Sequence, residues 1–153
     1  MAEALQVLVR ETASADWDAF VQERPCASLY HLSGWTDLSS EVFGHRTLFV
    51  EAREPSGALA GILPVVQQRS WLLGNFATSV ACFNYGGALT EYPRVAEELM
   101  RRASETVEAL GCRYLEFRDV QERPATAQCC APGQPLPGFP RAAPQQWSQA
   151  RRL

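Results

Sequence analysis

His31 and the aromatic residues beside it are the most suggestive chemical group in this 153-residue sequence. Tyr30 directly precedes the histidine, and Trp35 follows it by about one helical turn. Because an imidazole can change its charge near neutral pH, a histidine next to aromatic side chains could line a binding cleft. The alternative is that Trp35 belongs to the core and that His31 is an exposed or capping residue. The sequence leaves both interpretations open.

A second candidate group lies in the segment FNYGGA and just after it. Asn84 and Tyr85 offer hydrogen bonds to a ligand, and Glu91 offers a carboxylate. Gly86 and Gly87 lie between them, and glycine permits backbone conformations and close approaches that other residues resist. The alternative interpretation is a glycine turn that lets the chain cross the edge of a sheet.

Several kinds of catalytic chemistry are excluded or disfavoured by residue types. All fourteen fixed cations are arginines, so Schiff-base and P-loop lysine chemistry is excluded. The five cysteines form no Cys-x-x-Cys pair, and with two histidines they predict no zinc site. Ser33, His31 and Asp37 could be combined into a triad, but no serine lies in a nucleophile elbow. The catalytic residues therefore stay unassigned, and we expect no metal and no cofactor.

The composition is that of a globular domain, with 46% hydrophobic and 20% charged residues. A net charge of −3 argues against a DNA-binding surface spread over the domain. Every apolar run is shorter than the ~18 residues of a membrane-spanning helix. The N-terminal segment shows no signal-peptide pattern. We therefore expect a cytoplasmic protein.

The composition changes at Arg123. Residues 123–153 contain six prolines and four arginines but no acidic residue. Because proline interrupts helices and central strands, we predict a folded domain over residues 1–122 and a disordered tail over residues 123–153.

Hydrophobic periodicity and turn signals predict the element order β-α-α-β-β-β-α-β. This order indicates an α/β or α+β fold, with a mixed sheet and helices on both of its faces. The expected strands are Leu5–Val9, Arg46–Arg53, Ala58–Gln68, a strand around Phe76–Val80, and Cys112–Arg118; the expected helices begin at Ser14, Ser33 and Pro93.

Three local predictions can be checked against a structure. Trp35, Leu38 and Val42 form the apolar stripe of the helix that begins at Ser33, and such a stripe faces a core. The helix Pro93–Leu110 carries a longer apolar stripe. Pro64 interrupts a predicted strand, and its missing N–H implies an edge position or a bulge there.

Six short motifs resemble, in their order and spacing, the first lobe of FemAB-like proteins. The resemblance includes relatives associated with exopolysaccharide and PEP-CTERM loci, and it extends to the GNAT acyltransferase fold. The motifs are DWDAFV (Asp16–Val21), ASLYHLSGW (Ala27–Trp35), VFGHRT (Val42–Thr47), AGILPV (Ala60–Val65), FNYGGAL (Phe83–Leu89) and GCRYLEFRD (Gly111–Asp119).

This resemblance implies a GNAT-like lobe that helps to transfer an aminoacyl or acyl group to an amine of a cell-envelope or exopolysaccharide precursor. The lobe would bind that precursor or another small acceptor. The implied substrate-binding residues are Tyr30, His31, Trp35, Asn84, Tyr85, Gly86, Gly87 and Glu91.

FemAB-like proteins usually contain two such lobes in tandem, and aminoacyl-tRNA would bind through the second lobe. The resemblance ends after Val120, so we expect a gene that is truncated or frameshifted there and a chain that is weakly active alone.

Two alternatives remain. One is a non-catalytic binding module or remnant, which docks to a partner or dimerises through the exposed face of the lobe. The other is a free-standing CoA-dependent N-acetyltransferase, whose pyrophosphate loop would read Gln/Arg-x-x-Gly-x-Gly/Ala. Gly86 and Ala88 match that pattern, but Phe83 replaces its first residue and Pro93 opens the following helix too late.

Overall fold

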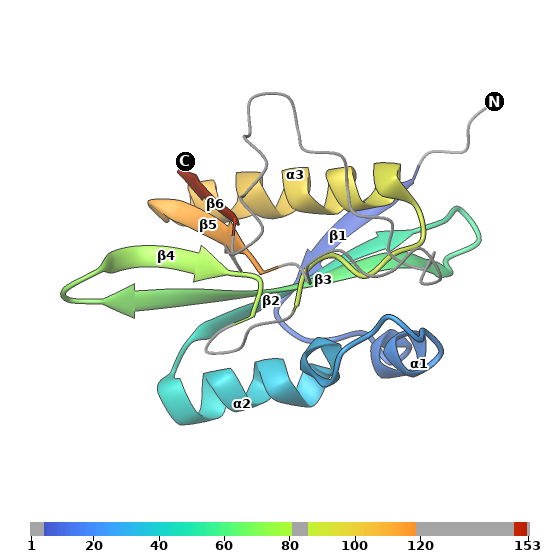
Figure 1. Ribbon diagram of the computed structural model, residues 1–153, viewed down its shortest axis with the longest axis horizontal. Coiled ribbons are helices and arrows are strands. Elements are labelled where there is room, and N and C mark those ends of the chain that lie inside the picture. Colours follow the sequence, from blue (N-terminus) through green and yellow to red (C-terminus); the bar gives the residue numbers. More distant parts are fainter. Residues whose placement is uncertain (1–4, 81–85, 119–148, 153) are drawn as a thin grey trace.

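The computed structural model describes residues 5–80, residues 86–118 and the backbone of residues 149–152. The strands are β1 (Gln6–Arg10), β2 (Arg46–Arg53), β3 (Leu59–Ser70), β4 (Gly74–Thr78), β5 (Tyr114–Phe117) and β6 (Gln149–Arg152). The helices are α1 (Trp17–Gln22), the short 3₁₀ helix η1 (Leu29–His31), α2 (Ser33–Phe43) and α3 (Pro93–Ala109) (Figure 1).

The described strands form one mixed sheet in the order β1-β2-β3-β4-β5-β6. Each neighbouring pair is antiparallel except β4 and β5, which run parallel. A parallel pair needs a crossover connection, and α3 provides it between these two strands.

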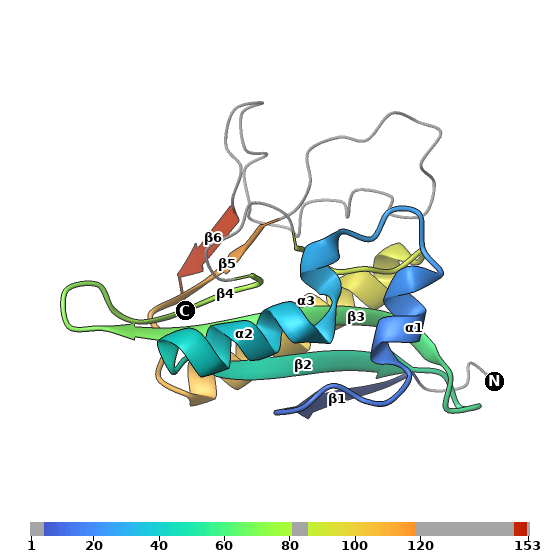
Figure 2. The same ribbon diagram turned by 90° about the horizontal axis from the view of Figure 1, so that it is seen from below.

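The helices cover both faces of the sheet. Figures 1 and 2 show α3 on one face and α1 and α2 on the other. Apolar residues of the sheet pack against α3 in one core cluster. A second cluster surrounds Trp17 of α1, whose ring meets that of Phe49 edge to face with 4.9 Å between centroids. The predicted α+β class, with a mixed sheet and helices, is confirmed.

α3 packs against the sheet as its sequence predicts. Pro93 occupies the first turn, and Gly111 adopts a φ of 72° just after the helix. Val95 and Leu99 belong to its buried stripe. The helix approaches β3 so closely that a Cβ atom on Gly61 would lie 2.8 Å from Val95 Cγ1. A glycine is therefore needed where this helix crosses the sheet.

α2 corrects the prediction about its apolar stripe. The helix forms where expected, but Thr36 and Ser39 are its buried residues, while Leu38 and Val42 are exposed and Trp35 is half-buried. The two small polar side chains lie under the helix, so its bulky apolar side chains face away from the sheet.

Residues 149–152 are the described part of the predicted tail. Their backbone forms β6, which pairs antiparallel with β5. These residues follow the last proline of the tail, Pro144, so every one of them has an N–H for the ladder. The rest of the predicted disordered tail lies outside the described residues.

Pro64 lies in β3, a strand with neighbours on both sides. Ile62 exchanges backbone hydrogen bonds with Leu89. Residues two apart in a strand point their backbone N–H and C=O groups to the same edge, so Pro64 faces the edge that Ile62 faces. β4 reaches the same edge of β3 as far as the pairing of Thr78 with Val66. Pro64 thus lies between two separate pairings of this edge. Every described partner on the edge therefore keeps its hydrogen bond although Pro64 has no N–H.

Candidate functional site

A carboxylate of α1 binds the first residue of α2 and thereby fixes the junction between the two helices. Asp18 in α1 accepts hydrogen bonds from the backbone N–H and the hydroxyl group of Ser33, each at 2.8 Å. Ser33 is the first residue of α2, where N–H groups lack helical acceptors and a negative charge is favourable. α1 therefore caps α2 and sets where α2 begins.

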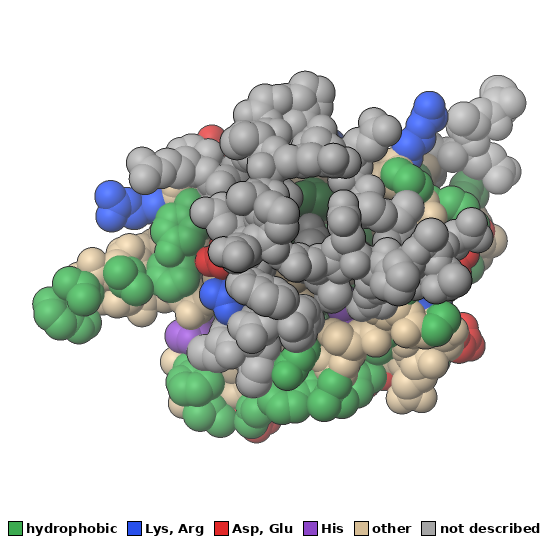
Figure 3. Space-filling model, in the orientation of Figure 1, with side chains coloured by type: hydrophobic (Ala, Val, Ile, Leu, Met, Phe, Trp, Pro, Cys, Tyr) green, Lys and Arg blue, Asp and Glu red, His purple; other side chains and the backbone are tan. Residues whose placement is uncertain are grey.

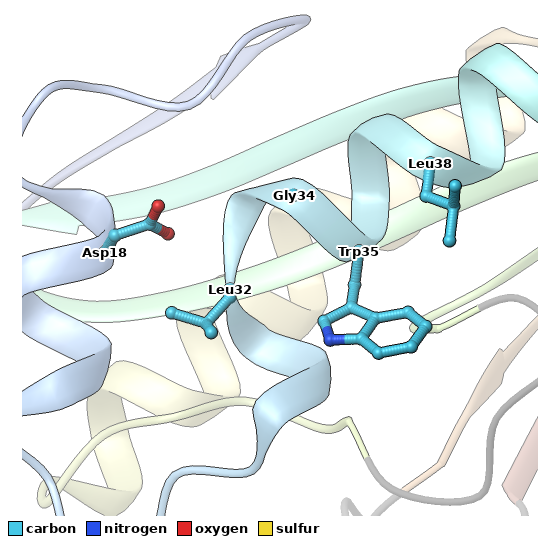
Figure 4. A pocket seen from close by; sticks show the side chains of 5 residues that line it. All are labelled: Asp18, Leu32, Gly34, Trp35 and Leu38. Carbon is cyan, nitrogen blue, oxygen red and sulfur yellow. The ribbon is translucent and has the colours of Figure 1, made fainter.

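An open concavity of about 330 Å³ lies over this junction, lined by Asp18, Leu32, Gly34, Trp35 and Leu38. Figure 4 shows Trp35 and Leu38 pointing to the same side of α2 and Leu32 pointing toward α1, with the Asp18 carboxylate near the start of α2. The ring of Tyr30 contacts that of Trp35 with 5.5 Å between centroids. The wall of the concavity is therefore apolar and partly aromatic. It includes Trp35 and touches Tyr30, both of which the sequence analysis named as candidate binding residues.

His31 lies beside this region but inside the protein, with 3% of its surface exposed. Its Nδ1 atom lies 3.1 Å from the backbone nitrogen of Ser28, and its Nε2 atom lies 3.0 Å from the Gly87 carbonyl oxygen. Because the Ser28 N–H can only donate, Nδ1 is the acceptor and the proton is on Nε2, which donates to Gly87. The imidazole is thus neutral and joins two segments of the chain.

The backbone around His31 is also used by the core. Its carbonyl oxygen accepts a hydrogen bond of 2.8 Å from the indole N–H of Trp17. His31 therefore lies in the interior and not in the wall of the concavity, and it connects Trp17, η1 and the segment that contains Gly87.

The glycine-containing segment packs into the fold. Gly86 and Gly87 are both buried, and the Gly86 N–H donates to the Arg118 carbonyl oxygen at 2.8 Å. A Cβ atom on Gly86 would lie 1.7 Å from a methyl carbon of Val80, so no larger side chain fits without movement. Glu91 is exposed in the bend before α3.

Asn84 and Tyr85 lie outside the described residues. The described part of the segment leaves little for a pyrophosphate to bind, because the Gly86 N–H is already bonded and α3 begins with Pro93, which has no N–H.

A buried ionic cluster was not predicted from the sequence. Glu51 in β2 is fully buried, and its carboxylate accepts hydrogen bonds from the Ser14 N–H at 3.2 Å and from Arg53 at 2.9 and 3.1 Å. Arg53 also donates to both oxygens of Asp16, at 2.8 and 2.9 Å. The hydrogen bonds from Arg53 hold the pKa of Asp16 far below its usual range, and those to Asp16 raise the pKa of Arg53.

The signal for this cluster is the alternation of Glu51 and Arg53, which places both side chains on one face of a strand. The cluster joins β2 to the segment before α1, and every carboxylate in it accepts hydrogen bonds. Its arrangement is that of a structural clamp.

The described residues contain no group of three or more His, Cys, Asp or Glu side chains that could hold a metal ion. Cys26 and Cys112 are buried, and burial raises the pKa of Cys112. No helix in the described part of the chain is long and apolar enough to cross a membrane.

No protein-family model matches this sequence, and no curated protein matches it.

Proposed function

We propose that this chain is the acceptor-side lobe of a FemAB-like transferase, which moves an aminoacyl or acyl group to an amine of a cell-envelope or exopolysaccharide precursor in the cytoplasm. We take the strand and helix order of this chain to be that of a GNAT-like lobe. Support comes from the mixed sheet with helices on both faces and the crossover of α3 between parallel β4 and β5.

The observation that carries the proposal is the concavity at the junction of α1 and α2. It lies in the part of the sequence where ASLYHLSGW carries the resemblance, and Trp35 forms part of its wall. Its volume of about 330 Å³ lies at the lower end of the range of small-ligand sites, roughly 300–1,000 Å³. An open, apolar wall with one carboxylate at its end suits the peptide or acyl portion of an acceptor.

The chemistry of such a transfer limits what this lobe must contribute. The acceptor nitrogen forms a bond to the carbonyl carbon, the ester C–O bond breaks, and a proton from the amine goes to the leaving oxygen. The amine must be held about 3–3.5 Å from that carbon. Asp18 is the one titratable side chain among the described lining residues, and both of its oxygens already accept hydrogen bonds from Ser33. The lobe's contribution is therefore to bind and orient the acceptor.

The test is a titration of the ¹⁵N-labelled chain with a UDP-linked peptidoglycan precursor pentapeptide, observed through the indole N–H signals. We expect the Trp35 signal to shift saturably and the signal of fully buried Trp17 to stay in place. Trp35→Ala should abolish binding, and Tyr92→Ala, at the start of α3, should leave it unchanged. A titration without a shift at Trp35 would contradict this function, as would acyl transfer by the chain alone at an ordinary enzymatic rate.

A binding module without catalysis is the second candidate, and the exposed apolar side chains of α2 favour it. A CoA-dependent acetyltransferase is disfavoured by the bonded Gly86 N–H. Calorimetry with acetyl-CoA should accordingly show no heat of binding.

A further inference from the structure

The turn between β3 and β4 exposes three large apolar side chains in succession. Trp71 is 96% exposed, Leu72 71% and Leu73 57%; we call these three residues the hairpin tip. The turn is held in shape by Ser70, whose hydroxyl oxygen accepts hydrogen bonds from the N–H groups of Leu72 and Leu73 at 3.3 Å. A preformed apolar projection loses little conformational freedom when it binds, which is typical of an interface anchor.

The exposed side of α2 is a second apolar surface. Leu38 and Val42 are exposed there, and Asp37 and Glu41 directly precede them in the chain. We call these four residues the α2 outer face. Figure 3 shows hydrophobic side chains gathered along α2 and again on the hairpin that projects from the sheet.

The two surfaces are complementary in charge. Arg69 is exposed at the base of the hairpin tip, while Asp37 and Glu41 give the α2 outer face a negative potential. Burial raises the pKa of Asp37, and the charges of Glu41 and Asp18 raise it further. None of Arg69, Asp37 and Glu41 forms an ion pair within the part of the chain that the structure describes.

The two surfaces also lie at the same end of the molecule. In both ribbon views the hairpin between β3 and β4 projects at the end where α2 terminates. A two-fold axis near this end can bring the hairpin of each copy to α2 of the other, and such an arrangement closes on itself.

We propose that a second copy of this chain covers both surfaces, with the hairpin tip of each copy packed on the α2 outer face of the other and Arg69 opposite Asp37 and Glu41. A lipid surface is the competing occupant for an exposed Trp-Leu-Leu tip. The acidic residues beside Leu38 and Val42 favour a protein surface that carries a cation, as Arg69 does beside the hairpin tip, over an anionic bilayer, which would repel them. This self-association does not depend on the proposed transferase function.

Sedimentation velocity of the full chain over a roughly hundredfold concentration range tests the proposal. The wild-type chain should dimerise, and Trp71→Ser should raise the dissociation constant at least about tenfold, as expected for a buried aromatic anchor. Tyr92→Ser is the matched control. It removes another exposed aromatic ring, because Tyr92 is 55% exposed, and α3 begins there at the end of the molecule away from the hairpin (Figure 1).

Charge reversal tests the pairing of the two surfaces. Arg69→Glu and Glu41→Arg should each weaken the dimer, and the double variant should restore it because both charges are exchanged. A monomeric wild-type chain, a loss of dimer in Tyr92→Ser, or a double variant no better than the single ones would overturn the proposal. A wild-type chain that stays monomeric but floats with phosphatidylcholine–phosphatidylglycerol vesicles, with Trp71→Ser losing this binding, would instead assign the tip to a bilayer.

Discussion

The carboxylate of Asp18 holds Ser33 by both its backbone N–H and its hydroxyl group, at 2.8 Å each. The two residues belong to different helices, so the start of α2 is set by a side chain from α1. The wall of the concavity follows from this contact, because Leu32, Gly34 and Trp35 surround Ser33 in the chain.

Asp18→Ala should destabilise the protein by about 0.5–2 kcal/mol, the usual cost of removing a helix cap. The free energy of unfolding is measured by urea denaturation. Ser33→Ala is the matched control and should cost less, because it keeps the Asp18 bond to the backbone N–H. Equal stability of Asp18→Ala and the wild-type chain would show that the cap does not hold α2.

His31→Ala should cost about 1–3 kcal/mol, because it leaves the Ser28 N–H and the Gly87 carbonyl without their imidazole partner. His31→Asn places an amide oxygen near the position of Nδ1, and His31→Gln places an amide nitrogen near that of Nε2. Each variant should therefore recover part of the loss in urea denaturation. If all three variants unfold like the wild-type chain, the two hydrogen bonds contribute nothing.

Gly61→Ala and Gly34→Ala should have effects of opposite sign. A Cβ atom on Gly61 would meet Val95, Thr90 and Leu99 at 2.8–3.0 Å, so we expect a loss of about 1–3 kcal/mol. A Cβ atom on Gly34 meets nothing within 4 Å, and alanine is the better helix former by about 1 kcal/mol. Thermal unfolding of both variants checks the signs, and a neutral Gly61→Ala would mean that α3 can move away from β3.

Asp16→Asn should destabilise the protein at neutral pH but not in acid. The pKa of Asp16 is lower in the folded state, so its ionised form stabilises the fold above its unfolded value of about 3.8. That contribution is lost as the pH falls from there through the lower folded value. Urea denaturation between neutral and acidic pH should show the two curves converging. Glu23→Gln, at the other end of α1, should stay within about 0.5 kcal/mol of the wild-type chain throughout.

The sequence predicted best the elements whose signals are local. Pro93 and Gly111 mark the two ends of α3, and the spacing of its apolar residues defines the buried stripe. The turn between β2 and β3 was equally clear, since Gly57 adopts a φ of 88° there. Such signals depend on neighbouring residues and need no knowledge of distant partners.

The interior of the candidate site could not be predicted in the same way. His31 bonds to Gly87, which lies 56 residues further along the chain. The rotation of α2 is set by Asp18 and by the small residues Thr36 and Ser39, so its apolar stripe faced outward against the prediction. Glu51 can be buried because Arg53 neutralises its charge. From the charge pattern of the sequence alone, Glu51 would instead be expected at the surface.

Pro64 has a consequence for how local opening can spread through the sheet. Its missing N–H separates the pairing of β3 with β4 from the bridge between Ile62 and Leu89, so no continuous ladder of hydrogen bonds joins the two. Fraying that begins in the hairpin between β3 and β4 therefore has no ladder along which to reach that bridge.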